Sequence, residues 1–250
     1  MEKQLTGRVA VVIGGGSGIG AAIAVLYARE GADVAVLDRN EENARAVAEE
    51  CRSSGGRATA LTVDATDGEA VRAAMDRVVA ELDGIDVLVN SAGVLDETPL
   101  LEMTEATFDR VLAVDLKAVF LGIRWAAPHM VERGGGRIIN IASQLGIKGG
   151  TGLTHYVAAK AGVIGMTKAM ALELAQYKIL VNAIAPGPIV TPLIEGLSAE
   201  WKAAKQAELP IGRFGQAHEV APTALLLASS PGGDLYTGQT LGPNSGDVMP

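Results

Sequence analysis

A tyrosine and a lysine stand four residues apart in the alanine-rich stretch THYVAAK, residues 154–160. On a helix, this spacing places Tyr156 and Lys160 one turn apart on the same face. A free phenol ionises near pH ~10, too high for an efficient base at neutral pH, and a neighbouring ammonium stabilises the phenolate. The two residues are therefore a candidate proton donor and acceptor, although an ordinary helix surface can carry the same spacing.

A second group of residues could bind a nucleotide. The glycine-rich run GGGSGIG (14–20) follows the apolar run RVAVVI (8–13) and opens a helix, so its backbone N–H groups could hold a pyrophosphate. Asp38 ends the next apolar run, DVAVLD (33–38). A carboxylate there can bind both ribose hydroxyls and repels a 2′-phosphate, which favours NAD over NADP. Arg39 could in principle accept that phosphate, and Asp38 could instead be a plain turn residue.

The elements that must position these residues alternate between short apolar strands and helices. The pattern predicts strands at 8–13, 33–38, 58–64, 86–90, 137–143, 179–186 and 238–242, and helices at 18–30, 40–54, 67–82, 104–133, 154–176 and 219–229. Asn40 and Thr104 are candidate helix caps. This alternation indicates an α/β fold, a Rossmann-type doubly wound sheet of mostly parallel strands with helices on both faces. No linker divides the chain, so we expect one domain over residues 1–250.

Small or polar residues collect at the later strand ends, where a doubly wound sheet binds its ligands. These residues are Asp64, the run NSAG (90–93), Ser143 and the run PGPIVT (186–191). A purely structural sheet would not need this combination.

Composition excludes several classes of function. The chain of 250 residues has a net charge of −8 and no basic run, which argues against nucleic acid or an anionic membrane as the main partner. Cys51 is the single cysteine, and the three histidines lie far apart, so neither a disulfide nor a zinc site is expected. The uncharged run from Val9 to Ala28 is interrupted by glycines and is not read as a targeting or spanning segment. We expect a cytoplasmic protein.

Over nearly its whole length, the chain resembles the short-chain dehydrogenase/reductase family. The residues that carry the resemblance are Asp38, Asp64, Ser143 and the runs GGGSGIG, NSAG, YVAAK and PGPIVT, and Ser143 precedes Tyr156 by 13 positions, as is typical of that family.

The resemblance implies a role for each matching residue. Tyr156 would be the catalytic acid and base, Lys160 would hold the nicotinamide ribose and lower the pKa of Tyr156, and Ser143 would bind the substrate oxygen. Residues implied to bind NAD, besides Tyr156 and Lys160, are Gly14, Ser17, Gly18, Ile19, Gly20, Asp38, Arg39, Asp64, Ala65, Asn90, Ala92, Gly93, Pro186, Gly187, Ile189 and Thr191. Substrate would meet Gln144, Leu153 and Leu193 as well as Ser143 and Tyr156, under a lid formed by residues 188–212.

Two positions depart from the family pattern. Ile13 stands where the family usually has a threonine, and Asp115 stands where it has a catalytic asparagine. In the family, the helix is distorted at that asparagine, and a backbone carbonyl there holds a water beside the lysine. We expect the backbone carbonyl, rather than the Asp115 carboxylate, to hold that water here. Asp115→Asn should then change kcat by less than about tenfold.

The expected function is that of an NAD-dependent oxidoreductase that interconverts a secondary alcohol and a ketone. The first alternative is a 3-oxoacyl carrier-protein reductase, which usually takes NADPH and wants a basic docking patch. A second alternative, of another class, is a non-catalytic NAD-binding or redox-sensing protein. As in the family, a homotetramer is expected, joined through the helices that carry Asp115 and Tyr156 and through the C-terminal segment. The outer positions of those helices would include Ala118, Ala161, Gly165 and Ala169.

Overall fold

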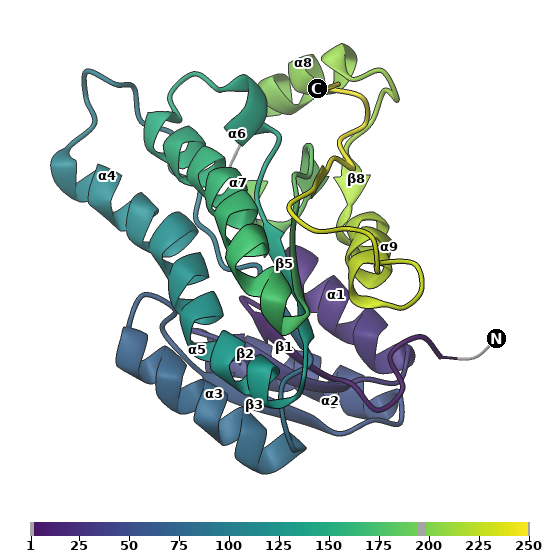
Figure 1. Cartoon of the computed structure of the whole chain (residues 1–250). Coiled ribbons are helices and arrows are strands. Elements are labelled where there is room, and N and C mark those ends of the chain that lie inside the picture. Colours follow the sequence, from purple (N-terminus) through teal and green to yellow (C-terminus); the bar gives the residue numbers. More distant parts are fainter. Residues whose placement is uncertain (1–2, 195–198, 250) are drawn as a thin grey trace.

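The predicted doubly wound α/β fold is confirmed by the structure, a computed structural model that describes residues 3–194 and 199–249. Seven parallel strands form the central sheet in the order β3-β2-β1-β4-β5-β6-β9 (Figure 1). Their bounds are β1 Val9–Ile13, β2 Asp33–Asp38, β3 Ala58–Thr62, β4 Val87–Asn90, β5 Gly136–Ile141, β6 Ile179–Ile184 and β9 Thr240–Leu241. The strand order reverses between β1 and β4. In doubly wound sheets the ligand crevice lies at this point, beyond the carboxyl ends of the strands.

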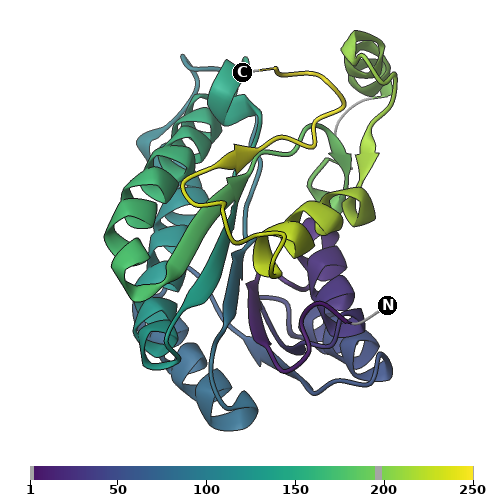
Figure 2. The same cartoon turned by 45° about the vertical axis from the view of Figure 1, so that its right-hand side comes forward.

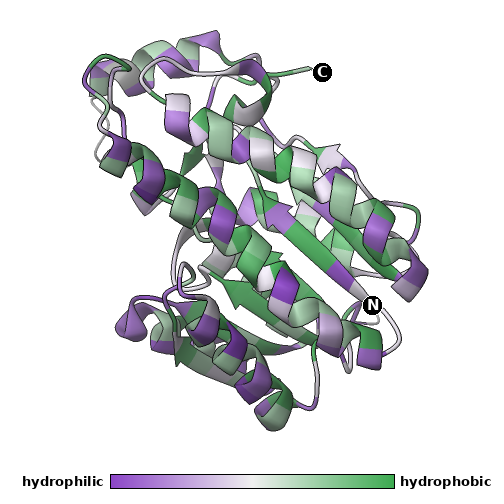
Figure 3. Ribbon diagram, turned by 60° about the vertical axis from the view of Figure 1, so that its left-hand side comes forward, coloured by the Kyte–Doolittle hydropathy of each residue, from purple (hydrophilic) through white to green (hydrophobic). Residues whose placement is uncertain are grey.

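Helices cover both faces of the sheet, as Figure 2 shows. One face packs against α1 (Gly18–Arg29), α2 (Glu41–Ser53) and α9 (Ala217–Ala228). The other packs against α3 (Gly68–Leu82), α5 (Ala118–Glu132) and α7 (Thr154–Leu174). Because both faces are covered, the strands are apolar along their length, and Figure 3 shows them mostly in the hydrophobic colour. Every residue of β1 is buried.

Helix caps follow the sequence signals. The Asn40 side chain accepts a hydrogen bond from the Asn43 N–H at 3.0 Å at the start of α2, and Thr104 accepts one from the Thr107 N–H at 3.1 Å at the start of α4 (Glu105–Leu112). Each satisfies a backbone donor that has no partner inside its helix. Both predicted caps are confirmed.

The helix expected over 104–133 is not a regular α-helix throughout. A π-helical turn, η1 (Ala113–Lys117), separates α4 from α5 and has Asp115 at its centre. Turns of this kind are rare and occur mostly at functional sites. The turn changes the direction of the Asp115 side chain relative to a regular helix.

Short elements beyond β5 were not expected. They are α6 (Leu145–Lys148), the 3-10 turns η2 (Ala175–Tyr177) and η3 (Pro192–Ile194), α8 (Ala199–Glu208), and a small second sheet of β7 (Ile189–Val190) with β8 (Gly215–Gln216). The predicted lid, 188–212, thus contains β7, η3 and α8, while its residues 195–198 lie outside the described residues.

The amino ends of the central strands are tied together by one buried carboxylate. Asp86 accepts hydrogen bonds from the Val9 N–H at 2.8 Å, from Arg8 Nη1 at 3.3 Å and from Arg133 Nη2 at 3.0 Å. These contacts join the start of β1, the start of β4 and the end of α5. We call this group the Asp86 clamp. It lies at the end of the sheet opposite the crevice.

Within the described ranges, no helix is long and apolar enough to cross a membrane.

Candidate active site

Four buried side chains come together beyond the carboxyl end of β5. Ser143 follows that strand directly, Tyr156 and Lys160 lie on the first turns of α7, and Asp115 lies on η1. Their exposed fractions are all below one tenth. Lys160 Nζ donates to the carbonyl oxygen of Ile141 at 3.1 Å, which ties α7 to the end of β5. The structure therefore brings the four predicted catalytic residues to one place.

The Asp115 carboxylate lies beside Lys160, contrary to expectation. Asp115 Oδ1 is 3.1 Å from Lys160 Nζ, and Oδ2 accepts a hydrogen bond from the Val94 N–H at 3.1 Å. A Cβ on Gly93 would come within 2.9 Å of Asp115 Oδ1, so only glycine leaves room for the carboxylate there. The expectation that the Asp115 side chain stays apart from Lys160 is wrong, whereas the role of the backbone carbonyl stays a prediction. The π-helical turn, together with glycine at position 93, lets the side chain reach the ammonium.

The surroundings of Tyr156 do not lower its pKa overall. Burial raises the pKa of the phenol, and the Asp115 charge raises it further, whereas the Lys160 ammonium and a hydrogen bond with Ser143 lower it. The net shift is upward, so the expected lowering by Lys160 alone is outweighed. Burial lowers the pKa of Lys160, but Asp115 and Tyr156 more than offset this, so the net pKa is raised and Lys160 stays charged.

The glycine-rich loop has the tight backbone that its sequence predicts. Gly14 has φ of +74°, and a Cβ there would overlap the backbone of Ala92; a Cβ on Gly20 would overlap the Gly14 carbonyl. Gly18 has φ of +54°, and a Cβ there would lie 3.3 Å from the Thr191 side chain. These contacts give the close turn and close helix packing of a dinucleotide loop, so the loop fits a pyrophosphate. Ser17 and Ile19 lie at the N-terminus of α1 within this loop.

Asp38 closes the loop at the end of β2. Its Oδ2 accepts a hydrogen bond from the Gly16 N–H at 2.9 Å, and its Oδ1 accepts one from the Asn40 N–H at 2.9 Å. Both backbone contacts hold the carboxylate beside the glycine loop, where a ribose would lie. Arg39 is exposed, and its charge helps lower the pKa of Asp64.

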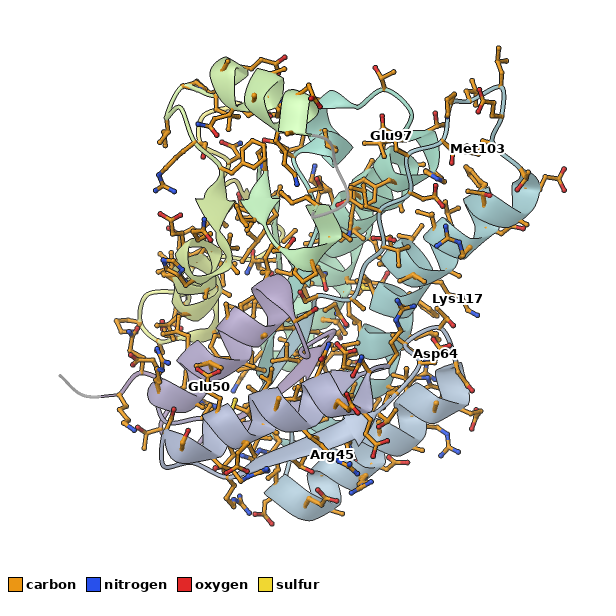
Figure 4. The ribbon with its side chains drawn as sticks, turned by 180° about the vertical axis from the view of Figure 1, so that it is seen from behind. Arg45, Glu50, Asp64, Glu97, Met103 and Lys117 are labelled. Carbon is orange, nitrogen blue, oxygen red and sulfur yellow. The ribbon has the colours of Figure 1, made fainter. Side chains whose placement is uncertain are left out.

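Two of the predicted cofactor residues, Asp64 and Ala65, lie in the loop after β3. Asp64 Oδ1 accepts hydrogen bonds from the N–H and Oγ1 of Thr66, and these lower the pKa of the carboxyl. Asp64 is exposed, and Ala65 beside it is half-buried. Lys117 donates to the carbonyl oxygen of Thr66 at 3.4 Å and is labelled just above Asp64 in Figure 4. The structure thus gathers Asp64 and Ala65 next to η1.

The side chain of Asn90, a predicted cofactor residue, is buried between strands. It is 2 % exposed, and its Nδ2 donates to Asn140 Oδ1 at 2.9 Å, while Asn140 Nδ2 donates to Thr167 Oγ1 at 3.0 Å. Asn90 Oδ1 has no partner among the described residues. Asn90 Oδ1 lies near the Ile13 side chain, since a Cβ added to Gly122 would contact both. The hydroxyl of the threonine that the family usually has at position 13 could donate a hydrogen bond to this oxygen. The Asn90 side chain therefore links β4 to β5.

The run PGPIVT leaves β6 across the top of the crevice. The carbonyl oxygen of Pro186 accepts a hydrogen bond from the Gln144 N–H at 3.1 Å, and the Gly187 N–H donates to the Pro243 carbonyl at 3.1 Å. Ile189 is buried in β7 and Thr191 faces the glycine loop. All four predicted cofactor residues of this run thus border the crevice.

The predicted substrate residues are of mixed character. Leu153 is half-buried at the start of α7, and Leu193 is 43 % exposed on η3. Gln144 is 3 % exposed, and its amide nitrogen donates to Asp247 near the C-terminus. Asp247 was missed by sequence reasoning, because no motif marks a contact between residues a hundred positions apart. No group of three or more histidine, cysteine or acidic side chains that could hold a metal occurs in the part of the chain that the structure describes.

A family model of the short chain dehydrogenases matches residues 8–202. The chain belongs to the short-chain dehydrogenase family. It is 40 % identical over 246 residues to the 3-oxoacyl-(acyl-carrier-protein) reductase of Thermotoga maritima, covering 98 % of this chain and 100 % of that protein. It is 44 % identical over 230 residues to the cis-4-hydroxycyclohexanecarboxylate dehydrogenase of Sinomonas cyclohexanicum, covering 92 % of each.

Among solved structures, the fold is similar to that of a 7α-hydroxysteroid dehydrogenase in complex with NADH and 7-oxo glycochenodeoxycholic acid. The TM-score is 0.94 at 33 % identity, with 100 % of this chain and 97 % of that chain covered. The predicted family is confirmed. As a member, the chain is an oxidoreductase that binds a nicotinamide dinucleotide.

Proposed function

We propose that the enzyme interconverts a secondary alcohol and a ketone, with Tyr156 exchanging the proton at the substrate oxygen. The observation that carries this proposal is the buried group of Ser143, Tyr156 and Lys160 beside a loop that fits a dinucleotide. The nicotinamide cofactor, when bound, supplies or accepts the hydride. A non-catalytic role, the alternative of another class, would not require these three side chains to meet in a water-poor site.

Each side chain has a distinct task in this mechanism. In oxidation, the Tyr156 phenolate takes the alcohol proton, and in reduction the phenol returns it. The Ser143 hydroxyl donates a hydrogen bond to the same oxygen, whose negative charge is greatest during the reaction. Lys160, held by the Ile141 carbonyl and by Asp115, keeps a positive charge near the phenolate.

We propose NAD rather than NADP as the cofactor. The Asp38 carboxylate, held by the N–H groups of Gly16 and Asn40, supports this choice because it would repel a 2′-phosphate. The test is kcat/KM with each cofactor at saturating substrate. Asp38→Ala should narrow the preference for NAD. A wild-type preference for NADP would refute the assignment and make Arg39 the residue of interest.

Two substrate classes remain candidates. The names of the relatives favour a 3-oxoacyl group on a carrier protein over the free secondary alcohol that the sequence alone favoured. The charges of this chain favour a free small molecule, because basic side chains in and beside segment 188–212 are already paired: Lys148 and Lys205 with Asp247, and Arg213 with Glu219. An acidic carrier would have to compete with these carboxylates.

One assay separates the two classes. The kcat/KM for reduction should be measured with a 3-oxoacyl thioester on acyl carrier protein, with the same acyl group on a small thiol, and with a cyclic ketone. A free-substrate enzyme should reduce the ketone and gain little from the carrier. A gain of more than about tenfold from the carrier would establish recognition of the carrier protein and refute the free-substrate proposal.

We also propose a homotetramer, because large apolar side chains lie exposed on α5 and α7. Phe120 is 44 % exposed and Leu172 is 83 % exposed. Of the small residues expected on the outer faces, Ala161, Gly165 and Ala169 are exposed. Ala118 is 3 % exposed and belongs to the chain's own core, so its expected outer position is wrong. Light scattering at micromolar concentration should give four times the chain mass, and a monomer mass would contradict the proposal.

A further inference from the structure

A single carboxylate near the C-terminus holds three side chains from separate parts of the chain. Asp247 accepts hydrogen bonds from Lys148 Nζ at 2.7 Å, from Lys205 Nζ at 2.9 to 3.0 Å, and from Gln144 Nε2. The Asp247 side chain is 7 % exposed, and that of Lys205 is 13 % exposed. The group is therefore largely shielded from water, where charged hydrogen bonds are stronger than on an open surface.

The three donors come from the walls of the proposed substrate site. Gln144 follows Ser143 directly, Lys148 ends α6, and Lys205 lies on α8 in segment 188–212. Figures 1 and 2 show the C-terminal segment, in yellow, passing between α6 and α8 beyond the end of the sheet. Asp247 thus connects the loop that carries Ser143 with the helix that covers it.

The two lysines of this group share a counter-charge only while Asp247 is ionised. Burial raises the pKa of the Asp247 carboxyl, but the two lysines outweigh it and the net pKa lies below the usual value. Without that charge, Lys148 would lose its only carboxylate among the ion pairs described, and Lys205 would keep Glu208, 3.0 Å away on its own helix. The link between α6 and α8 depends on Asp247.

We propose that Asp247 is a positioning residue, which holds the Gln144 loop and α8 together and so sets the affinity for the alcohol or ketone. The proposal rests on the proposed function, because it places the substrate between these two walls. Asp247 itself touches neither Ser143 nor Tyr156 in any described contact, so it acts through Gln144 and Lys205.

The test compares Asp247→Asn with a matched control. Asp234→Asn removes the same charge from an ion pair of similar length, with Arg137 Nη2 at 2.6 Å, on the amino-end side of the sheet. We expect Asp247→Asn to raise the KM for the alcohol or ketone by about tenfold, with kcat and the KM for NAD within about twofold. Asp234→Asn should leave all three unchanged. Asp247→Glu, which keeps the charge, should recover most of the lost affinity.

A second measurement distinguishes this proposal from the proposed function. Hydrogen exchange of the free protein should show faster exchange in α8 for Asp247→Asn and not for Asp234→Asn, whether or not any substrate is turned over. Two outcomes refute the positioning role when wild type is active. In the first, Asp247→Asn keeps the wild-type KM. In the second, it loses kcat and thermal stability without a change in KM. If α8 exchanges at the wild-type rate, the link itself is refuted. Absence of turnover in wild type would instead refute the proposed function.

Discussion

Replacing Asp115 by asparagine removes one negative charge from the site and keeps the shape of the side chain. Asparagine can still accept the hydrogen bond from the Val94 N–H, so the π-helical turn should persist. The substitution changes the electrostatic interaction with two groups. One is the Lys160 ammonium, 3.1 Å from Asp115 Oδ1, and the other is the Tyr156 phenolate. Lys160 Nζ is 5.5 Å from the centre of the Tyr156 ring.

These distances set the size of the effect. The carboxylate oxygen can be no farther from the ring centre than the two distances combined, about 8.6 Å. At an effective dielectric constant of about 20, a negative charge at that distance from Asp115 is repelled by about 2 kcal/mol. Removal of this repulsion should favour the phenolate by about 25-fold at a given pH below the pKa.

The assay is the pH dependence of kcat for alcohol oxidation by wild type and Asp115→Asn. Because Asp115 raises the pKa of Tyr156, the variant should reach its plateau at lower pH. At pH values well below the plateau it should be faster, by up to about 25-fold, with similar rates on the plateau. This replaces the expectation of a change below tenfold.

Two results would refute the reasoning. Profiles that superimpose would show that the carboxylate is not coupled to Tyr156. A variant that is slower at every pH and binds NAD more weakly would show that Asp115 acts chiefly by keeping Lys160 charged. The pair is close enough for this, since the same dielectric gives about 5 kcal/mol at 3.1 Å.

Three further outcomes are expected. Tyr156→Phe should almost abolish turnover while NAD still binds, because only the hydroxyl is lost; substantial residual kcat would move the proton transfer to another group, with buried His155 the first to test. Gly14→Ala should lower the melting temperature and the affinity for NAD more than Gly7→Ala does. The two glycines share φ near +75°, but only Gly14 is crowded by the loop after β4. Equal losses in the two variants would mean that backbone strain alone matters. Arg213 lowers the pKa of Glu219 to about 2, so the stabilisation by this pair is complete above the ordinary value of 4.5 and lost as pH falls toward 2. Glu219→Gln should therefore lower the melting temperature at neutral pH and lose its effect in acid, and an equal loss at both pH values would contradict the assignment.

The strands and most helices could be predicted from the sequence because their signals are local. Five buried residues in a row make β1 recognisable without its neighbours, and Asn40 marks the start of α2. The meeting of Ser143, Tyr156 and Lys160 could also be predicted, because the order and spacing of the motifs resemble those of the short-chain dehydrogenase/reductase family. The pattern contained no comparable signal for the four-residue helix α6 or for α8.

Contacts between distant side chains could not be predicted in the same way. The position of Asp115 is clear from the sequence, but its contact with Lys160 depends on a π-helical turn and on the space left by Gly93. The pKa of Tyr156 depends on burial, which competes with Lys160 and outweighs it. Asp247 meets Gln144 across a sequence separation of 103 residues, so no local pattern marks the contact.

The Asp86 clamp has a consequence for changing the substrate of this enzyme. It joins β1, β4 and α5 at the amino end of the sheet, far from the loops that border the crevice. Mutant libraries for new substrates can therefore be confined to residues 144–153 and 188–194, which contain neither the clamp nor any strand of the central sheet. Random mutagenesis of the whole chain would also change the clamp, where a buried carboxylate that loses its donors is destabilising. The residues of the clamp and the residues proposed to contact substrate thus lie at opposite ends of one sheet. A new specificity can therefore be selected without first restoring stability.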